Sequence, residues 1–428
     1  MKKAIKTGIS SLLVLGMVTA CGRVDNNLLM DDSALNPNNE MNLSNDFNAL
    51  GQSTKQFTIS FRANPTPAEI KTLEEKYNAK IQRIIPQIGV AIVEQNETES
   101  TGVALEVMAK SMSSERTLEA TEPVNMVKLE KVKVNDPQVG KQYHLDVTNT
   151  MDAWEVTMGS PKVKIAIVDT GMDLNHPDLK NKIVEGKNIV EPMKKPIDDN
   201  GHGTHVAGIA AAQGNNSIGV SGIAPGCALM PVKVLKAGRG TDVDIAEGIV
   251  WATDKGADVI NISIGLYTKS TAMEKAVRYA IAKNVVVVSS AGNEFKSSKI
   301  HLPSMIKGVI EVSASNKYDR FASFSNYDQQ ISVAAPGDGI LSTLPTYTVE
   351  LSKESGKNYG VMSGTSMASP MVAGLAALLK SKNRSMTPAE IKKKIETGSV
   401  DLGKTGYDVY FGHGRIDVAN TIGTKTVL

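Results

Sequence analysis

Three short motifs hold residue types that together can activate a hydroxyl nucleophile. In Ala-Ile-Val-Asp-Thr-Gly, Asp169 ends an apolar, strand-like run, where a carboxylate is costly unless hydrogen bonds hold it. In Asn-Gly-His-Gly-Thr-His-Val-Ala-Gly, glycines flank His202. In Ser-Gly-Thr-Ser-Met-Ala-Ser-Pro, Ser366 stands at the start of a helix-like run, where the helix dipole is positive. A serine hydroxyl reacts poorly by itself, so an acid, an imidazole and a serine together suggest nucleophilic catalysis.

Each motif also has a structural interpretation if it is taken alone. Asp-Thr-Gly occurs in unrelated enzymes, a histidine between glycines can simply occupy a loop, and Gly-Thr-Ser can cap a helix. A fourth motif, Ser-Ser-Ala-Gly-Asn-Glu at 289–294, follows the apolar run 285–288. The argument for chemistry therefore depends on four motifs occurring together and in the order Asp, His, Ser.

Together, the four motifs resemble the subtilase family of serine proteases, from about residue 135 to about residue 420. The resemblance implies that Ser366 is the nucleophile and that His202 takes its proton and later gives it to the leaving amine. It also implies that Asp169 fixes the imidazole tautomer. Asn293 would donate to the oxyanion together with the Ser366 backbone N–H.

The remaining motif histidines and the metal-binding motifs of the sequence give no alternative to this triad. The triad needs one imidazole, so His176 and His205 are assigned to structure. There is no His-Glu-x-x-His and no cysteine cluster, so we expect no catalytic metal.

The resemblance also implies a binding cleft for extended polypeptide, in which strand edges pair with the substrate backbone. Two segments resemble the family's edge strands, and a third would complete the wall of the pocket for P1, the residue before the cleaved bond. The pocket lining looks small and apolar, so we expect large apolar or aromatic P1 residues, while Glu294 at the rim could tolerate basic ones. The expected binding residues are Gly238, Gly240, Ser263, Ile264, Gly265, Ala291 and Gly292.

Residues 214–220, Gly-Asn-Asn-Ser-Ile-Gly-Val, resemble the calcium loop of the family. Oxygen ligands of these kinds suit a structural Ca²⁺ ion. The alternative is a plain turn rich in Asn and Gly. The expected ligands are the Asn216 side chain, the carbonyl groups of Ile218 and Val220, and the carboxylates of Asp136 and Asp178.

The elements that must position these residues form an α/β pattern from about residue 135 onwards. Apolar strand-like runs alternate with helical runs, which predicts a mostly parallel sheet with helices on both faces, the three-layer fold of the resembled family. The expected strands are 163–168, 229–235, 259–264, 285–288, 309–312 and 331–334, and the expected helices are 243–253, 272–282 and 366–379.

Residues 55–134 show a different order, β-α-β-β-α-β, which predicts a small ferredoxin-like α+β domain. The expected strands are 56–61, 81–85, 89–93 and 124–129, with helices from Pro67 to Tyr77 and at 102–112. This domain resembles the inhibitory propeptide that precedes subtilase domains. Residues 135–428 would then be the peptidase domain.

The first 54 residues resemble an export and anchoring segment. Residues 1–20 have three lysines followed by a short apolar run, which is typical of a signal peptide. The stretch Val-Thr-Ala-Cys at 18–21 resembles a bacterial lipobox. Cys21 would therefore carry lipid and bind the membrane. An ordinary signal peptide is the alternative. Residues 21–54 are rich in Asn, Asp and Ser and predict a flexible tether.

The bulk composition fits these expectations. The chain has 428 residues and a net charge of +2, which indicates two or three domains and no nucleic-acid partner. The sequence thus predicts an exported serine endopeptidase, made as a self-processing zymogen and either anchored or released after processing. The alternatives are an anchored, self-inhibited scaffold that only binds polypeptide, and a peptidase of the same fold that trims chain ends.

Overall fold

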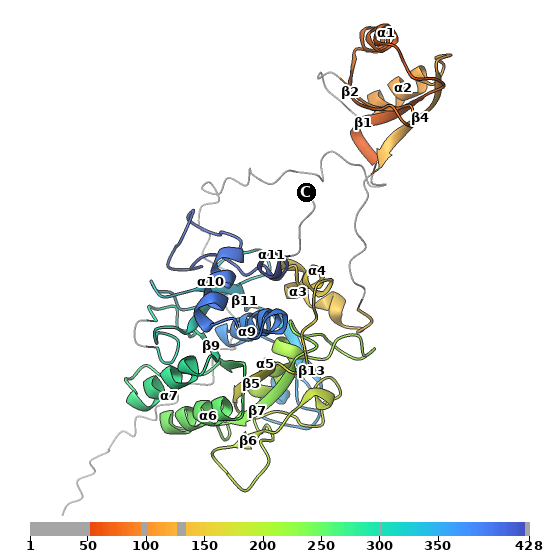
Figure 1. The fold of residues 1–428 in the computed structure, drawn as a ribbon. Helices are drawn as coiled ribbons and strands as arrows, with labels where there is room; N and C mark the ends of the chain where they lie inside the picture. The colour runs from red at the N-terminus through yellow and green to blue at the C-terminus, as the bar shows by residue number, and fades with distance from the viewer. Residues whose placement is uncertain (1–51, 96–101, 126–133, 299–300, 424–428) are drawn as a thin grey trace, which may run out of the picture. The chain divides into compact units, whose positions relative to one another are not determined.

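The computed structural model describes residues 52–95, 102–125, 134–298 and 301–423, without the side chains of 52–55, 95 and 102–106 (Figure 1). These residues fall into an N-terminal unit, 52–125, and a C-terminal unit, 134–423. Cys21, the signal segment and most of the expected tether lie outside the described residues. None of the described helices is long and apolar enough to cross a membrane.

The N-terminal unit has the expected β-α-β-β-α-β order. Its antiparallel sheet has the order β2-β3-β1-β4. Thr66 and Glu69 bond reciprocally at the start of the first helix, and this capping box satisfies N–H groups that a helix start leaves free. The elements are β1 (Gln52–Phe61), α1 (Pro67–Tyr77), β2 (Ala79–Ile85), β3 (Val90–Gln95), α2 (Gly102–Met112) and β4 (Leu118–Asn125).

The last strand of this unit differs from the expectation. It was predicted at 124–129, but β4 begins at Leu118 and ends at Asn125, and 126–129 lie outside the described residues. The reason is pairing and burial. Leu118 pairs with Phe61 of β1, and both side chains are buried in the core with Phe57 and Ile59.

The C-terminal unit is built around a seven-stranded sheet in the order β11-β10-β9-β8-β5-β7-β6, with parallel pairing at every step. This confirms the mostly parallel sheet and the three-layer α/β fold. The strands are β5 (Lys164–Asp169), β6 (Lys187–Asn188), β7 (Ala228–Lys233), β8 (Val259–Ile262), β9 (Val286–Ser290), β10 (Ile310–Ser315) and β11 (Val333–Pro336).

Helices cover both faces of this sheet (Figure 1). Alternate side chains of β5 show the division, because Ile165 and Ile167 join the core under α5 and α9, whereas Ala166 and Val168 join the core under α6 and α7. Short helices and a two-stranded antiparallel sheet, β12 with β13, complete the unit. The α-helices of this unit and these two strands are α3 (Tyr143–Val147), α4 (Thr150–Trp154), α5 (His202–Ala211), α6 (Asp242–Asp254), α7 (Thr271–Ala282), β12 (Ile340–Thr343), α8 (Ser352–Ser355), β13 (Tyr359–Met362), α9 (Thr365–Lys382), α10 (Pro388–Gly398) and α11 (Val418–Ile422).

Helices α5 and α9 pack directly on each other, and small residues make this possible. A Cβ atom on Gly374 of α9 would lie only 2.9 Å from the Ala210 carbonyl oxygen of α5, closer than packed atoms allow. Both helices therefore cross the same face of the sheet at short range. This packing matters for the site, because α5 begins at His202 and α9 begins at Thr365, next to Ser366.

Candidate active site

The candidate site lies where several parallel strands end. Asp169 is the last residue of β5, Ser263 follows β8, and Asn293 follows β9. The carboxyl ends of parallel strands share one edge of a sheet, and ligands of open α/β sheets usually bind there. The predicted residues of four separate motifs are therefore delivered to the same edge by the fold.

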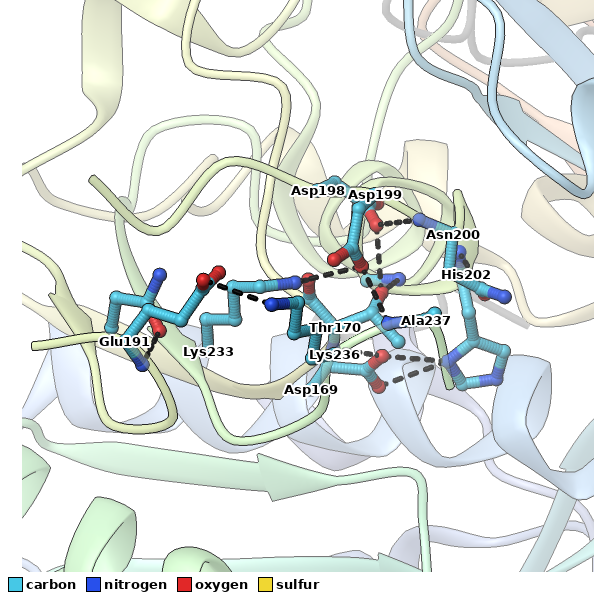
Figure 2. A network of polar contacts seen from close by, with 12 residues as sticks. Asp169, Thr170, Glu191, Asp198, Asp199, Asn200, His202, Lys233, Lys236 and Ala237 are labelled. Carbon is cyan, nitrogen blue, oxygen red and sulfur yellow. Dashed lines mark hydrogen bonds and ion pairs between the residues drawn. The ribbon is translucent and has the colours of Figure 1, made fainter. Parts of the chain in front are cut away.

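Asp169 and His202 are in direct contact, and Figure 2 shows the carboxylate facing the ring. His202 Nδ1 lies 2.8 and 3.0 Å from the two Asp169 carboxylate oxygens. Asp169 is fully buried, and the Thr170 backbone N–H also donates to it at 2.7 Å. Burial alone would lower the pKa of His202, but the charge and the hydrogen bond of Asp169 outweigh it, and the pKa is raised above 6.5.

A second buried carboxylate, that of Asp198, connects the segments that carry Asp169 and His202 (Figure 2). Its Oδ1 accepts from the Thr170 hydroxyl at 2.8 Å and from the Asn200 and Gly201 backbone N–H groups at 3.0 and 2.9 Å. Its Oδ2 accepts from the Thr204 backbone N–H and hydroxyl at 2.9 and 2.6 Å. Five donors on one carboxylate fix the loop before α5, and therefore the position of the histidine.

Ser366 lies in the first turn of α9 and is partly buried. Its hydroxyl donates to the Ser263 carbonyl oxygen at 3.0 Å, and the Ser263 hydroxyl donates back to the Ser366 carbonyl oxygen at 3.1 Å. A contact between Ser366 and His202 is not among those of the described residues. Hydrogen bonds between a nucleophile and its base are often long or misaligned without substrate.

Asn293 is fixed by its own side-chain oxygen. Oδ1 accepts from the Thr365 backbone N–H and hydroxyl, both at 2.8 Å, so the amide nitrogen Nδ2 keeps its two protons for another acceptor. A Cβ atom on Gly364 would lie 3.3 Å from Asn293 Nδ2 and 3.7 Å from the Ser366 backbone nitrogen. The two expected oxyanion donors thus border the same small region beside Gly364.

The two remaining motif histidines have structural contacts. His205 is buried and its Nε2 lies 3.1 Å from the Gly360 carbonyl oxygen; burial lowers its pKa to about 3. His176 packs edge-on against Tyr359, and its Nε2 lies 2.8 Å from the Asn358 carbonyl oxygen. Both rings therefore help to hold β13, the strand that leads into the Ser366 motif.

The residues expected to bind substrate separate into two groups. Ser263, Ile264 and Gly265 follow β8, Ala291 and Gly292 follow β9, and both segments contact the start of α9. Gly238 lies in a tight turn closed by two backbone bonds between Lys236 and Arg239, and a Cβ atom on Gly240 would meet the Val234 carbonyl oxygen at 2.2 Å. These two glycines are thus engaged within their own loop.

The glycines that were expected to wall the P1 pocket face polar side chains. A Cβ atom on Gly292 would meet the side chains of Asn326, Tyr267 and Glu294, and one on Gly265 would meet the His301 ring. The glycine walls are small, but the side chains that face them are polar. Tyr267, His301 and Asn326 carry no shared signal in the sequence because they come from three separate loops. Asp198 was not among the predicted residues, although an acid four residues before His202 is a local signal.

The expected calcium residues converge on the loop 214–220. Asp136 and Asp178 are both buried, and neither makes an ion pair with a described residue. Asp136 accepts from the Asn215 and Asn216 backbone N–H groups at 2.8 and 3.1 Å. Asp178 accepts from Asn216 Nδ2 at 2.9 Å and from the Val220 backbone N–H at 3.0 Å.

These contacts fit a cation site in part. Burial raises the pKa of Asp178, although hydrogen bonds oppose the shift, and a cation would favour the ionised form. The Ile218 N–H donates to the Asn216 side-chain oxygen at 2.8 Å, and the hydrogen bonds that Ile218 and Val220 make with this loop and with Asp178 use their N–H groups. Within the described ranges, no three His, Cys, Asp or Glu side chains cluster as a metal site; the expected site needs only two carboxylates.

The fold and this arrangement define a class, a serine hydrolase that carries a Ser, a His and an Asp at one edge of a parallel sheet. A family model described as the subtilase family matches residues 160–414, and the chain belongs to the subtilase family. It is a subtilisin-like serine endopeptidase.

Individual relatives agree with this assignment. The chain is 39% identical over 361 residues to "Thermophilic serine proteinase" of Bacillus sp. (strain AK1), covering 82% of this chain and 86% of the relative. It is 41% identical over 290 residues to "Thermitase" of Thermoactinomyces vulgaris, covering 67% and 98%. A solved protease structure from Pseudoalteromonas arctica PAMC 21717 covers 68% of this chain and 98% of its own at 32% identity, with a TM-score of 0.62.

Proposed function

We propose that Ser366 attacks the carbonyl carbon of a peptide bond while His202 accepts its proton and then protonates the leaving amine. The observation that carries this proposal is the contact of His202 Nδ1 with both oxygens of the buried Asp169 carboxylate. This contact reserves Nε2 for the serine and the leaving group, and the carboxylate stabilises the imidazolium that forms. Asp198 holds the loop on which this geometry depends.

The tetrahedral intermediate carries a negative oxygen, and we assign Asn293 Nδ2 and the Ser366 backbone N–H to it. Both donors border one region near the hydroxyl, and fixed donors there stabilise charge that develops only during the reaction. Because the Thr365 N–H and hydroxyl hold Asn293 Oδ1, the amide is oriented before substrate arrives.

Replacing Asn293 tests both the reaction and this donor. The wild-type protein should cleave casein at internal bonds, which neither a binding scaffold nor an enzyme that trims chain ends would do. Asn293→Ala should lower kcat about 10²–10³-fold with little change in KM, because the donor acts on the transition state. Kinetics on one peptide substrate, with melting curves of both proteins, measure this. A raised KM with unchanged kcat would place Asn293 in substrate binding instead.

We propose that a structural calcium ion binds between Asp136, Asp178 and the loop 214–220. The support is two buried carboxylates without a cationic partner in the described structure, both facing one loop. The Asn216 side-chain oxygen and the carbonyl groups of Ile218 and Val220 would supply the neutral ligands. The ion would stabilise the fold and take no part in the reaction.

Calcium is therefore expected to raise the melting temperature. At a hundredfold excess over its Kd it should add about 2.7 kcal/mol, or roughly 5–10 °C for a domain of this size. A chelator should reverse the effect, and Mg²⁺ should replace Ca²⁺ poorly because it demands stricter geometry. Asp178→Asn should lose the response, whereas the exposed control Asp146→Asn should keep it. An equal response to calcium in Asp178→Asn would refute this site.

The N-terminal unit is proposed to be an inhibitory propeptide within residues 55–134. Its ferredoxin-like fold is complete in itself, with its own core. The match to the thermophilic proteinase covers 361 residues, more than residues 135–428 contain, so it extends into this unit. We further propose that Cys21 carries lipid, so that the exported precursor is anchored and cleavage near residues 130–135 releases the peptidase domain.

A further inference from the structure

The space beside Ser366 is bordered by two backbone segments that both touch the start of α9. Ser263 accepts from the Ser366 hydroxyl at 3.0 Å, and the Gly292 backbone N–H donates to the Thr365 hydroxyl at 3.1 Å. As the sequence resemblance implies, we take the P1 side chain, which is next to the attacked carbonyl, to enter between the segments that contain Gly265 and Gly292. The identity of P1 therefore depends on what already occupies this space.

Polar side chains border this space. A Cβ atom on Gly292 would lie 2.4 Å from Asn326 Nδ2, 2.7 Å from the Tyr267 hydroxyl oxygen and 3.2 Å from Glu294 Oε2. On the opposite wall, a Cβ atom on Gly265 would lie 2.4 Å from the ring of His301. Both glycines therefore face side chains at short range.

Tyr267 is held in this position from several sides. Its hydroxyl donates to the Glu294 carboxylate and accepts from Asn326 Nδ2 at 2.7 Å. The Lys296 ammonium nitrogen lies 3.8 Å from the ring centroid, a favourable cation–π contact, and the His301 ring lies 5.0 Å away, centroid to centroid. A bulky group that displaced Tyr267 would have to break all of these contacts.

The partners of Tyr267 are themselves fixed. Asn326 Oδ1 accepts from the Glu294 and Lys296 backbone N–H groups at 3.0 and 3.1 Å. His301 is buried, and its Nδ1 lies 3.1 Å from the Ser304 hydroxyl. Burial and the Lys296 cation lower the pKa of His301 to about 4, so a neutral ring faces Gly265 at neutral pH.

We propose that Tyr267 is a specificity-determining residue that restricts P1 to small side chains such as alanine. This inference rests on the proposed attack by Ser366 and replaces the expectation of large apolar P1 residues. A small side chain fits between the glycine walls and leaves the contacts of Tyr267 intact. An aromatic P1 side chain must displace the tyrosine, whose hydroxyl would lose a partially buried partner.

Removing the tyrosine ring should enlarge the pocket. Tyr267 and Leu302 also line a cavity of about 300 Å³, whose apolar surface includes Met305 and Ile306. Without the ring, the space beside Gly292 would extend toward this cavity and gain room for an aromatic group. Leu302 directly follows His301 in the chain, so the cavity and the pocket share this segment.

The test uses two chromogenic peptides that differ only in P1, alanine or phenylalanine, with protein purified after expression of the full chain. In the wild type, kcat/KM for alanine should exceed that for phenylalanine by about tenfold or more. Tyr267→Ala should raise kcat/KM for phenylalanine about tenfold or more and leave alanine within about threefold. Tyr267→Phe loses only the hydroxyl, and its kcat/KM for phenylalanine should fall between those of the wild type and Tyr267→Ala. It replaces Tyr267→Ala in the test if that variant does not fold.

The matched control is Tyr318→Ala, because Tyr318 is exposed and absent from the pocket; its P1 ratio should equal that of the wild type. A wild-type preference for phenylalanine, or a P1 ratio that both Tyr267 variants leave unchanged, would overturn the inference while the protein still hydrolyses peptides. Failure to cleave either peptide, together with no labelling of Ser366 by a fluorophosphonate, would instead overturn the proposed function.

Discussion

Ser366→Ala is expected to lose about 10⁶-fold in kcat, leaving only the weak catalysis that oxyanion donors and substrate binding provide. The physical reason is that the neighbouring hydroxyls of α9 are engaged elsewhere: that of Thr365 donates to Asn293 Oδ1, and that of Ser369 donates to Asn261 Oδ1. Steady-state hydrolysis of a peptide anilide measures this. Ser323→Ala is a suitable control because Ser323 is an exposed serine of the same unit.

The same substitution tests self-processing. The Ser366→Ala precursor should remain uncut and cell-attached, whereas the wild type should yield a shorter, released peptidase. Ser366→Ala combined with Cys21→Ala should be released without being cut, because it lacks the proposed lipid. Equal release of Ser366→Ala and wild type, with an identical new N-terminus, would show that another protease performs the cleavage.

Asp169→Asn is expected to lower kcat by about 10⁴-fold while the fold persists, because the amide favours the wrong imidazole tautomer. The pH profile should change as well. In the wild type, Asp169 raises the pKa of His202 above 6.5. The neutral ring that can accept a proton, and with it the activity, therefore appears only as the pH rises through this raised pKa. Without the carboxylate charge, burial dominates, the pKa falls, and the acid limb should move to lower pH.

The dependence of kcat/KM on pH reports the pKa of the free enzyme and checks this directly. Asp146→Asn makes the same change of charge at an exposed position and should leave both the rate and the acid limb unchanged. An acid limb of Asp169→Asn at or above the wild-type position would contradict the assignment of Asp169 to His202.

Much of the fold and of the proposed triad was predictable because the signals are local. β5 and β8 appear as short apolar runs, and Asp169, His202, Asn293 and Ser366 each stand inside a recognisable motif. The parallel sheet then brings strand ends together. The start of α1 at Pro67 was also predictable from local sequence, and the structure adds a helix cap made by Thr66 and Glu69.

Features made by residues distant in sequence could not be predicted in this way. The P1 pocket combines Tyr267 and Glu294 with Asn326 and His301, whose contacts form only after β8, β9 and β10 are assembled. Tyr267 alone in a loop carries no pattern that indicates a pocket. The expectation of an apolar lining rested on glycines that stand inside local motifs. It did not include the side chains that face these glycines.

The boundary of β4 shows the same limit on a smaller scale. Apolar residues near 124–129 suggested a strand there, but the register with β1 is set by burial of Leu118 against Phe61. Asp198 is a different case, because four of its five hydrogen bonds come from residues 200–204 and the fifth comes from Thr170. Its position four residues before His202 could have suggested a role, but an acidic residue in a polar loop is usually exposed to solvent.

The most direct test of the central claim is to identify the residue that reacts with a fluorophosphonate probe. After labelling, digestion and mass spectrometry of the peptide that contains 363–370, we expect the modification on Ser366. Labelling should disappear in Ser366→Ala, and casein hydrolysis should be lost in proportion to the labelled fraction. Protein that hydrolyses casein fully while Ser366 stays unmodified at saturating probe would contradict the account.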